Sequence, residues 1–251
     1  MATVHHRERS FSDAVQDYAK AVYALEERGG AATTNALAER LGVTAASVSG
    51  MVKKLRELGL VVHVPYKGVR LTDEGRRLAL EVIRHHRLLE RYLSEELDVP
   101  WDRVHAEAEV LEHVLSEDLE ERIAAKLGHP ARDPHGDPIP SPEGELAEEE
   151  TRALIDLEPG ARGTFARVSD SDPEKLRFLG GLGIAPGMEL EVLAREPFGG
   201  PLTVLLAGRE HALGTELARA MRVAVGLVGP TPTRSMTLAA RGKTGHDTGG
   251  R

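Results

Sequence analysis

Apolar residues at helical spacing dominate the first part of the chain. They predict three amphipathic helices, over residues 12–28, 34–41 and 44–58. The Thr44 hydroxyl can cap the third helix, because it can accept a hydrogen bond from a free backbone amide. Residues 60–64 and 69–71 flank a Pro-Tyr-Lys-Gly turn and predict a β-hairpin. The order of helix, helix, turn, helix and hairpin predicts a winged helix-turn-helix domain over residues 1–75.

The middle of the chain is helical. A long amphipathic helix is predicted from Thr72 or Asp73 to about residue 97, and two further helices follow over residues 100–115 and 116–128. Together these helices indicate a second domain over residues 76–140.

The last part of the chain has a β pattern. Prolines and a Glu148-Glu149-Glu150 run mark residues 141–161 as a linker. Short apolar strands between glycines, with one helix over residues 173–181, predict a small β domain over residues 162–228. Residues 229–251 are rich in Pro, Thr, Gly and Arg and predict a disordered tail. The expected fold class is therefore mainly α with a small β part.

Composition excludes several classes of protein. The 251 residues contain no run of eighteen apolar residues, which argues against a transmembrane helix. The first ten residues are polar and lack the apolar core of a secretory signal. The absence of cysteine excludes disulfide scaffolds, thiolate metal sites and cysteine nucleophiles. A soluble cytoplasmic protein, not bound to membranes, is the expectation.

Charge separates the middle of the chain from its ends. Residues 81–160 carry 22 acidic and 8 basic residues, whereas residues 1–80 and 161–251 each carry 9 acidic and 12 basic residues. A mildly basic first part suits an anionic partner, and an acidic middle suits a cation. Most of the acidic residues are nevertheless expected to form solvated helix surface and linker.

The third predicted helix has the surface of a DNA-reading element. Its outer face carries small residues, which let the backbone approach base edges, and lysines, which suit phosphates. The predicted contacts with double-stranded DNA are Thr44, Ala46, Ser47, Ser49, Gly50, Lys53 and Lys54 on this helix, and Lys67 and Arg70 on the wing. Because the net charge of this part is only +3, tight binding is expected to need two copies of the domain. A helix-turn-helix used only for protein contacts is the alternative.

Histidines alternate with glutamates in the acidic middle. One predicted helix presents four of them within roughly a 100° arc: His105, Glu109, Glu112 and His113. The preceding helix places His86 and Glu90 on one face. Histidine and carboxylate on two neighbouring helices form a typical metal-site arrangement. Asp17 faces away from the apolar stripe of its own helix and could complete such a site. Surface carboxylates and capping histidines are the alternative.

Two other functions compete with a metal-binding regulator. A dimetal carboxylate enzyme would carry Glu-x-x-His on two helices, whereas this chain has Glu109 followed by Glu112-His113 and also a DNA-reading domain. A winged-helix regulator that senses something other than a metal is the second alternative. The sequence contains no Gly-x-Ser-x-Gly motif and no phosphate-binding Gly-rich loop, so we do not expect an enzyme.

Several stretches resemble the diphtheria toxin repressor family of metal-dependent regulators, over about residues 12–228. They are DYAKAVYALEE, LVVHVPYKGVRLTDEG, RHHRLLERYL, VHAEAEVLEHVLSEDLEERI, RDPHGDPIP and VSDSDPEKLRFLGGLGI. Within that family, the chain is most similar to actinobacterial manganese transport regulators with a C-terminal SH3-like domain. The resemblance implies a homodimeric, metal-activated repressor in which residues 76–140 bind metal and dimerise, and residues 162–228 form an SH3-like barrel.

The resemblance also implies two metal sites. The primary site would comprise Asp17, Glu109, Glu112 and His113, and the ancillary site His86, Glu90, His105 and Asp172. Iron-sensing members have Met and Cys at the positions of Asp17 and Glu109, so the oxygen donors here favour Mn(II), with Fe(II) or Co(II) as alternatives. Manganese regulators without the extra domain carry a glutamate where this chain has Lys20. The expected function is manganese-dependent repression of genes for metal-ion uptake and homeostasis, with an iron(II)-dependent repressor as the alternative.

Overall fold

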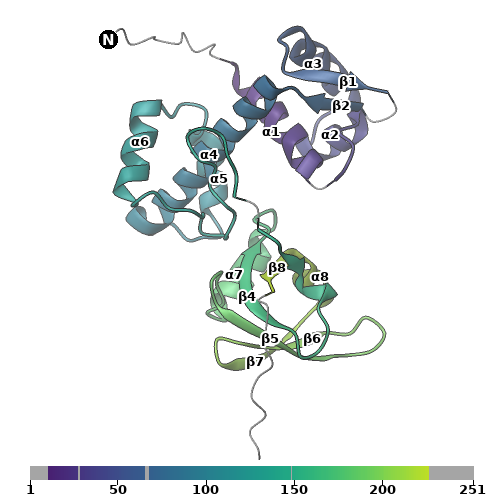
Figure 1. Ribbon diagram of the computed structural model, residues 1–251, viewed down its shortest axis with the longest axis vertical. Coiled ribbons are helices and arrows are strands. Elements are labelled where there is room, and N and C mark those ends of the chain that lie inside the picture. The colour runs from purple at the N-terminus through teal and green to yellow at the C-terminus, as the bar shows by residue number, and fades with distance from the viewer. Residues whose placement is uncertain (1–10, 28, 66–67, 148, 226–251) are drawn as a thin grey trace, which may run out of the picture.

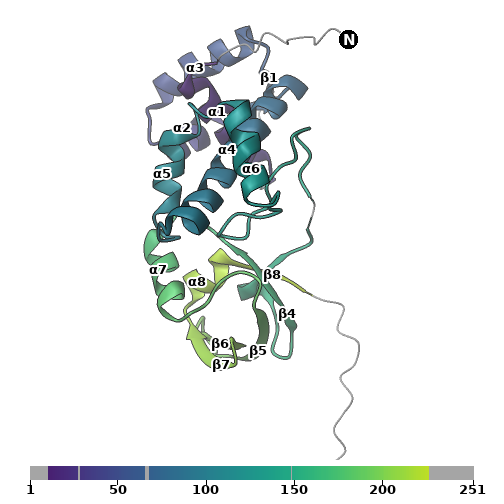
Figure 2. The same ribbon diagram turned by 90° about the vertical axis from the view of Figure 1, so that its left-hand side faces the viewer.

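Three domains follow one another along the molecule. The computed structural model describes residues 11–27, 29–65, 68–147 and 149–225. Figures 1 and 2 show the first domain at one end, the β domain at the other, and a helical domain between them. The wing residue Lys67 and residues 229–251, for which the sequence predicts disorder, lie outside the described residues.

The first domain is the predicted winged helix-turn-helix. It comprises α1 (Asp13–Glu27), α2 (Thr34–Leu41), α3 (Ala45–Glu57) and the antiparallel strands β1 (Val61–Val64) and β2 (Gly68–Leu71). The hydroxyls of Thr33 and Thr44 cap α2 and α3, each accepting a hydrogen bond from a backbone N–H at 3.2 Å. Val22, Leu37 and Val48 come from three different helices and are buried in one core, which fixes the orientation of α3.

One long helix serves the cores of two domains. The N-terminal half of α4 (Asp73–Leu97) contributes Leu78 and Val82 to the core of the first domain. Its C-terminal half packs Leu88 against Ala108 and Ile123, which lie on α5 (Val104–Leu111) and α6 (Glu117–Lys126). The helix predicted over residues 100–115 is shorter in the structure, because the residues on both sides of α5 form turns. Side chains of α4 thus take part in the cores of both the DNA-binding domain and the helical domain.

The third domain is the predicted SH3-like β domain. Its six-stranded antiparallel sheet has the order β3-β8-β4-β5-β6-β7. The strands are β3 (Arg152–Ala153), β4 (Arg162–Val168), β5 (Glu189–Arg195), β6 (Leu202–Leu206), β7 (Arg209–Leu213) and β8 (Met221–Ala224). They pack with α7 (Pro173–Gly181), α8 (Thr215–Ala220) and the 3-10 helix η1 (Leu154–Asp156).

The β domain begins earlier than the sequence indicates. β3 and η1 fall within the predicted linker over residues 141–161. They belong to the β domain because β3 pairs with β8 and because Leu154 and Leu157 are buried in its core. Elements this short show no periodic pattern of apolar residues. The prolines and acidic residues of the segment therefore predicted a linker instead.

The segment between α6 and the β domain is held against both neighbours. Arg84 of α4 donates a hydrogen bond to the Pro140 carbonyl at 2.7 Å, and the Val168 amide of β4 donates to the His135 carbonyl at 3.0 Å. Gly136 has a φ of +91°, and a Cβ at this position would lie 2.0 Å from the Ala166 carbonyl oxygen. This segment therefore connects α4 to the β domain by fixed contacts.

No helix in the described part of the chain combines the length and apolar character that a membrane crossing requires.

Candidate DNA-binding face and metal centres

The outer face of α3 is exposed as the sequence predicts. Within the described residues, the exposed members of the predicted DNA-contacting set are Thr44, Ala46, Ser47, Ser49, Gly50, Lys53, Lys54 and Arg70. A Cβ on Gly50 would meet no atom within 4 Å, so a ligand can approach the backbone closely there. Lys53 makes only a long, exposed ion pair with Glu57, at 3.9 Å, which leaves its ammonium available to a phosphate.

The predicted primary ligands gather where α1 meets the end of α5. We call Asp17, Glu109, Glu112 and His113 the interdomain cluster. The donor atoms of Asp17, Glu112 and His113 lie within 4.8 Å of one another. His113 Nε2 is 3.0 Å from Asp17 Oδ1 and 3.5 Å from Glu112 Oε1. Glu109 lies on the other side of Glu112, in a second group that also contains His86.

Gln16 orients the histidine of this cluster, a role that the sequence pattern did not reveal. The amide oxygen Oε1 of Gln16 accepts a hydrogen bond from His113 Nδ1 at 2.7 Å. Because an amide oxygen only accepts, Nδ1 carries a hydrogen, and Nε2 is the ring nitrogen left to bind a metal beside Asp17 and Glu112. Metal-binding histidines are commonly oriented in this way, by an acceptor at the other ring nitrogen.

Lys20 provides a cation inside the interdomain cluster. Its ammonium group donates to Glu109 Oε1 and to Glu112 Oε1, each at 2.7 Å. Burial lowers the pKa of Lys20, but the carboxylates of Glu112 and Glu109 raise it by more, so the net pKa is raised and the side chain is charged. Lys20 and Asp17 share α1, so one turn of the DNA-binding domain supplies both an anion and a cation to the helical domain.

A second group of donors lies where α4 and α5 meet the β domain. We call His86, Glu90, His105 and Asp170 the junction cluster, and their donor atoms all lie within 4.8 Å of one another. Glu90 Oε1 is 3.0 Å from His86 Nε2 and 3.3 Å from His105 Nδ1. His105 Nδ1 is also 3.1 Å from Asp170 Oδ2. The structure thus brings three of the four predicted ancillary ligands together.

The structure does not bring Asp172 into this cluster. Its carboxylate caps α7, because Oδ1 accepts from the Glu174 amide at 3.0 Å and Oδ2 pairs with Lys175 at 3.1 Å. Asp170 precedes the helix by three residues and is free to turn toward His105. Pro173 is the sequence signal that Asp170, and not Asp172, joins the cluster. Pro173 begins α7 and so gives the residue before it the capping position.

His86 connects the two clusters. Its Nδ1 lies against Glu112 Oε2 and its Nε2 against Glu90 Oε1. Burial lowers the pKa of His86, but hydrogen bonds to Glu112 and Glu90 outweigh it and raise the pKa to about 9. For His105, hydrogen bonds to Asp170 and Glu90 raise the pKa to about 10. The raised pKa values favour the protonated form of each ring, so a metal ion that binds these nitrogens must displace protons.

The donor sets of both clusters fit a hard divalent cation. They contain only carboxylate oxygens and imidazole nitrogens, the ligand types that suit Mn(II), and no sulfur. In the interdomain cluster, three carboxylates outnumber the single ammonium of Lys20 by two charges. One divalent cation would balance them.

A DNA-reading winged helix joined to a carboxylate and imidazole centre defines the class of metal-responsive DNA-binding regulators. Comparison with known families agrees with this class. Residues 10–69 match the N-terminal DNA-binding domain of the iron-dependent repressors, residues 72–141 match their metal-binding and dimerisation domain, and residues 152–225 match the FeoA domain. The chain belongs to the iron-dependent repressor family, which includes the diphtheria toxin repressor, and this confirms the resemblance seen in the sequence.

Two curated relatives cover nearly the whole chain. The iron-dependent repressor IdeR of Mycobacterium tuberculosis is 33% identical over 225 residues, which span 84% of this chain and 96% of that protein. The diphtheria toxin repressor of Corynebacterium diphtheriae is 32% identical over 227 residues, spanning 84% of this chain and 96% of that protein. The family consists of transcriptional repressors, which decides against the dimetal carboxylate enzyme.

Solved structures point to the same family. A manganese-dependent transcriptional repressor in complex with manganese is 45% identical, with a TM-score of 0.78, and the match covers 84% of this chain and 99% of that chain. The manganese regulator SloR is 32% identical, with a TM-score of 0.69, over 84% of this chain and 98% of that chain. This protein is accordingly a metal-dependent transcriptional repressor.

Removing an exposed charge from α3 is expected to weaken DNA binding through the phosphates. Lys54→Ala should lower affinity for specific and nonspecific duplexes alike. It should also reduce the slope of log affinity against log salt by about one for each phosphate that the side chain no longer neutralises. Lys126→Ala removes an exposed lysine of α6 that is remote from α3, and it should leave the slope unchanged. Fluorescence anisotropy titrations between 50 and about 200 mM salt measure both.

Affinity for Mn(II) is expected to rise throughout the range from pH 6.5 to 8.5. Because their pKa values are raised, His86 and His105 must each release a proton to bind a metal. Each released proton increases the affinity for Mn(II) by up to about tenfold per pH unit. Histidines with the ordinary pKa near 6.5 would give an affinity that levels off above about pH 7.5. Equilibrium dialysis at a series of pH values distinguishes the two, and a plateau above pH 7.5 would contradict the raised pKa values.

Proposed function

We propose that this protein is a manganese-dependent repressor that binds operator DNA as a homodimer and controls genes of metal-ion uptake and homeostasis. One observation carries the proposal. Asp17 lies on α1 of the DNA-binding domain, yet its carboxylate is 3.0 Å from His113, which belongs to the helical domain. A centre built from both domains can control the angle between them, and hence the position of α3.

The residues of the interdomain cluster explain why a cation is needed. Asp17, Glu109 and Glu112 carry three negative charges in a half-buried space, and Lys20 is the one permanent cation that the described part of the chain places among them. Burial raises the pKa of Asp17, although His113 and Lys20 oppose this. A bound divalent cation would supply the missing positive charge and join the carboxylates of the two domains.

The energetic requirement is moderate. To change the DNA-binding conformation from 1% to 99% of the molecules, a ligand must prefer that conformation by about 5.5 kcal/mol. A preference of this size requires donors that are correctly placed in only one of the two conformations. Asp17 meets this condition, because its position relative to Glu112 and His113 depends on the angle between the domains.

Manganese is favoured over iron by the donor atoms. Mn(II) is the weakest binder of the divalent series, so selectivity depends on hard oxygen ligands, geometry and supply. Asp17 and Glu109 both supply oxygen, and the relatives solved as manganese-dependent repressors include one at 45% identity. Iron(II) is the second candidate, because curated relatives at 33% identity are iron-dependent repressors. Operator titrations with each metal at its cellular free concentration separate the two.

The surface suited to dimerisation lies on α5, the turn after it, and α6. Large apolar side chains are exposed there: Val110, Leu111, Val114 and Leu119. Val110 and Val114 are 73% and 77% exposed, which is unfavourable in a monomer unless a partner covers them. A homodimer through this face would present two α3 helices to half-sites about one helical turn of DNA apart, roughly 34–36 Å.

Asp17→Asn is expected to abolish manganese-dependent operator binding. The amide is isosteric but lacks the negative charge that the cation must balance, so Mn(II) affinity at the interdomain cluster should fall by at least about 100-fold. Asp13→Asn on the same helix is the control, since Asp13 is exposed and outside the cluster. Operator affinity with and without Mn(II) is the measurement, and an unchanged response in Asp17→Asn would refute the mechanism.

Val114→Glu is expected to dissociate the dimer. Burying a carboxylate in an apolar interface is strongly unfavourable, so the dimer dissociation constant should increase by at least about 100-fold. Val62→Glu introduces the same change at an exposed position of β1 and should leave the dimer intact. Sedimentation equilibrium determines the oligomeric state. A dimeric Val114→Glu variant would place the interface elsewhere.

A further inference from the structure

Lys20 occupies part of the interdomain cluster in the metal-free protein. Its ammonium nitrogen lies 2.7 Å from Glu109 Oε1 and 2.7 Å from Glu112 Oε1. On α1, Lys20 follows Asp17 by about one turn, and the two glutamates are likewise about one turn apart at the end of α5. The DNA-binding domain thus places a positive charge on two carboxylates that also belong to the donor set for a divalent cation. Neither the ligand pattern nor the comparisons give this lysine a role.

The contact with Lys20 holds Glu109 apart from the other donors of the cluster. The donor atoms that lie close together belong to the remaining three residues: Asp17, Glu112 and His113. Glu109 lies on the other side of Glu112, in a group with His86. Its Oε1 accepts a hydrogen bond from Lys20, whereas His86 Nδ1 and His105 Nε2 are 3.7 and 3.9 Å away, beyond hydrogen-bond distance. The lysine is therefore the partner that fixes this oxygen.

Glu109 is the glutamate of the cluster that is free to change its position. Its side chain is 40% exposed, whereas that of Glu112 is fully buried. Both oxygens of Glu112 are engaged, Oε1 by Lys20 and Oε2 by His86. A half-exposed side chain can change its rotamer without disturbing a packed core. Release from Lys20 is thus sufficient to let the Glu109 carboxylate turn.

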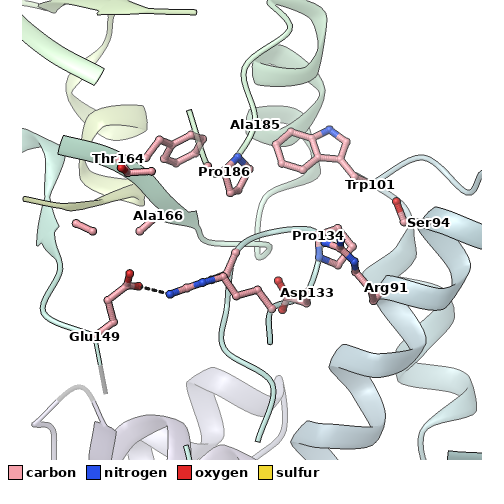
Figure 3. A pocket seen from close by; sticks show the side chains of 15 residues that line it. Arg91, Ser94, Trp101, Asp133, Pro134, Glu149, Thr164, Ala166, Ala185 and Pro186 are labelled. Carbon is pink, nitrogen blue, oxygen red and sulfur yellow. Dashed lines mark hydrogen bonds and ion pairs between the residues drawn. The ribbon is translucent and has the colours of Figure 1, made fainter. Parts of the chain in front are cut away.

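An ion reaches the interdomain cluster directly from solvent. Asp17 is 38% exposed and Glu109 is 40% exposed. The cleft of about 580 Å³ between the helical and β domains is a different space: Figure 3 shows it beside Arg91, Trp101 and Pro186, and the described residues that line it include no member of the interdomain cluster. An arriving ion consequently meets Glu109 while this carboxylate is still paired with Lys20.

We propose that Lys20 is a built-in competitor of the metal ion, which holds Glu109 in the metal-free protein and so sets the Mn(II) concentration at which the repressor responds. On metal binding, the hydrogen bond from Lys20 to Glu109 breaks and the carboxylate turns to the ion. The ammonium keeps its contact with Glu112, so three carboxylates, one ammonium and one divalent cation sum to zero charge. A conformation that must first be released lowers the apparent affinity of the ligand that needs it. The proposal rests on the proposed function, because it takes Mn(II) as the cation of this cluster.

Lys20→Met tests the competition, since methionine fills similar space without a charge. Glu109 is then free to bind, and a repulsion between ammonium and metal ion is removed. The affinity of the interdomain cluster for Mn(II) should therefore increase by at least about tenfold, and operator binding should begin at a correspondingly lower Mn(II) concentration. Equilibrium dialysis measures the affinity, in an Asp170→Asn background that weakens the junction cluster. An affinity that is unchanged or lower in Lys20→Met would overturn the proposal.

Two control variants separate competition from a general effect of charge. Lys20→Arg keeps the positive charge beside the two glutamates and should stay close to the wild-type affinity. Lys126→Met removes an exposed lysine that pairs with Glu96 on another part of the helical domain, and it should also leave the affinity unchanged. A rise in Lys126→Met equal to that in Lys20→Met would reduce the effect to net charge and overturn the proposal.

A crystal of the wild-type protein grown with Mn(II) keeps the proposal testable if Lys20→Met does not fold. Glu109 should then be a ligand of the ion in the interdomain cluster, with its oxygens beyond hydrogen-bond distance from the Lys20 ammonium. An ion in this cluster with the hydrogen bond from Lys20 to Glu109 unchanged would overturn the competition but leave the proposed function intact. A cluster that takes up no ion would instead reject the proposed function.

Discussion

Glu112 is the buried carboxylate on which the rest of the metal-binding region depends. Its side chain is fully buried, and it contacts Lys20, His86 and His113, which come from three different elements. Burial raises its pKa, but His86 and Lys20 outweigh this and lower it, so the group is ionised. An isolated buried carboxylate would be severely unfavourable. The fold therefore places two cationic groups against Glu112, Lys20 from the DNA-binding domain and His86 from α4.

The two histidines of α4 that lie beside Glu112 make different contacts. His85 faces away from the clusters and contacts the Glu112 backbone carbonyl through Nδ1 and the Glu120 carboxylate through Nε2, which ties α6 to the same point. His86 faces the clusters and reaches both of them. Adjacent histidines on one helix therefore have different tasks, one in holding α6 and one in joining two groups of ligands. A change in one cluster can reach the other through a single imidazole ring.

The β domain takes part in the same network. Asp170 follows β4 and pairs with His105, and the segment around His135 is fixed between α4 and β4. These contacts join the β domain both to the junction cluster and to α4. An SH3-like domain placed in this way contributes a carboxylate to the junction cluster and lines one side of a cleft. The DNA-binding domain and the β domain thus each contribute one aspartate to a cluster on the helical domain.

Much of this organisation follows from the sequence alone: the order of domains, the winged helix-turn-helix, the exposed face of α3 and most members of the two clusters. These features follow local rules, since helical periodicity places His105, Glu109 and His113 on one face and hydroxyl caps mark where helices begin. Only the tertiary structure decided which carboxylate of the β domain reaches His105. Asp170 and Asp172 are the same residue type and lie two positions apart, so the sequence does not tell which one reaches His105. In the structure Asp172 caps α7 and is therefore not in the junction cluster. Tertiary packing alone also placed Lys20 between Glu109 and Glu112, and brought Asp133 and His135 beneath Glu90. These pairs are distant along the chain, and no local pattern records the charge that a residue will meet across a domain boundary.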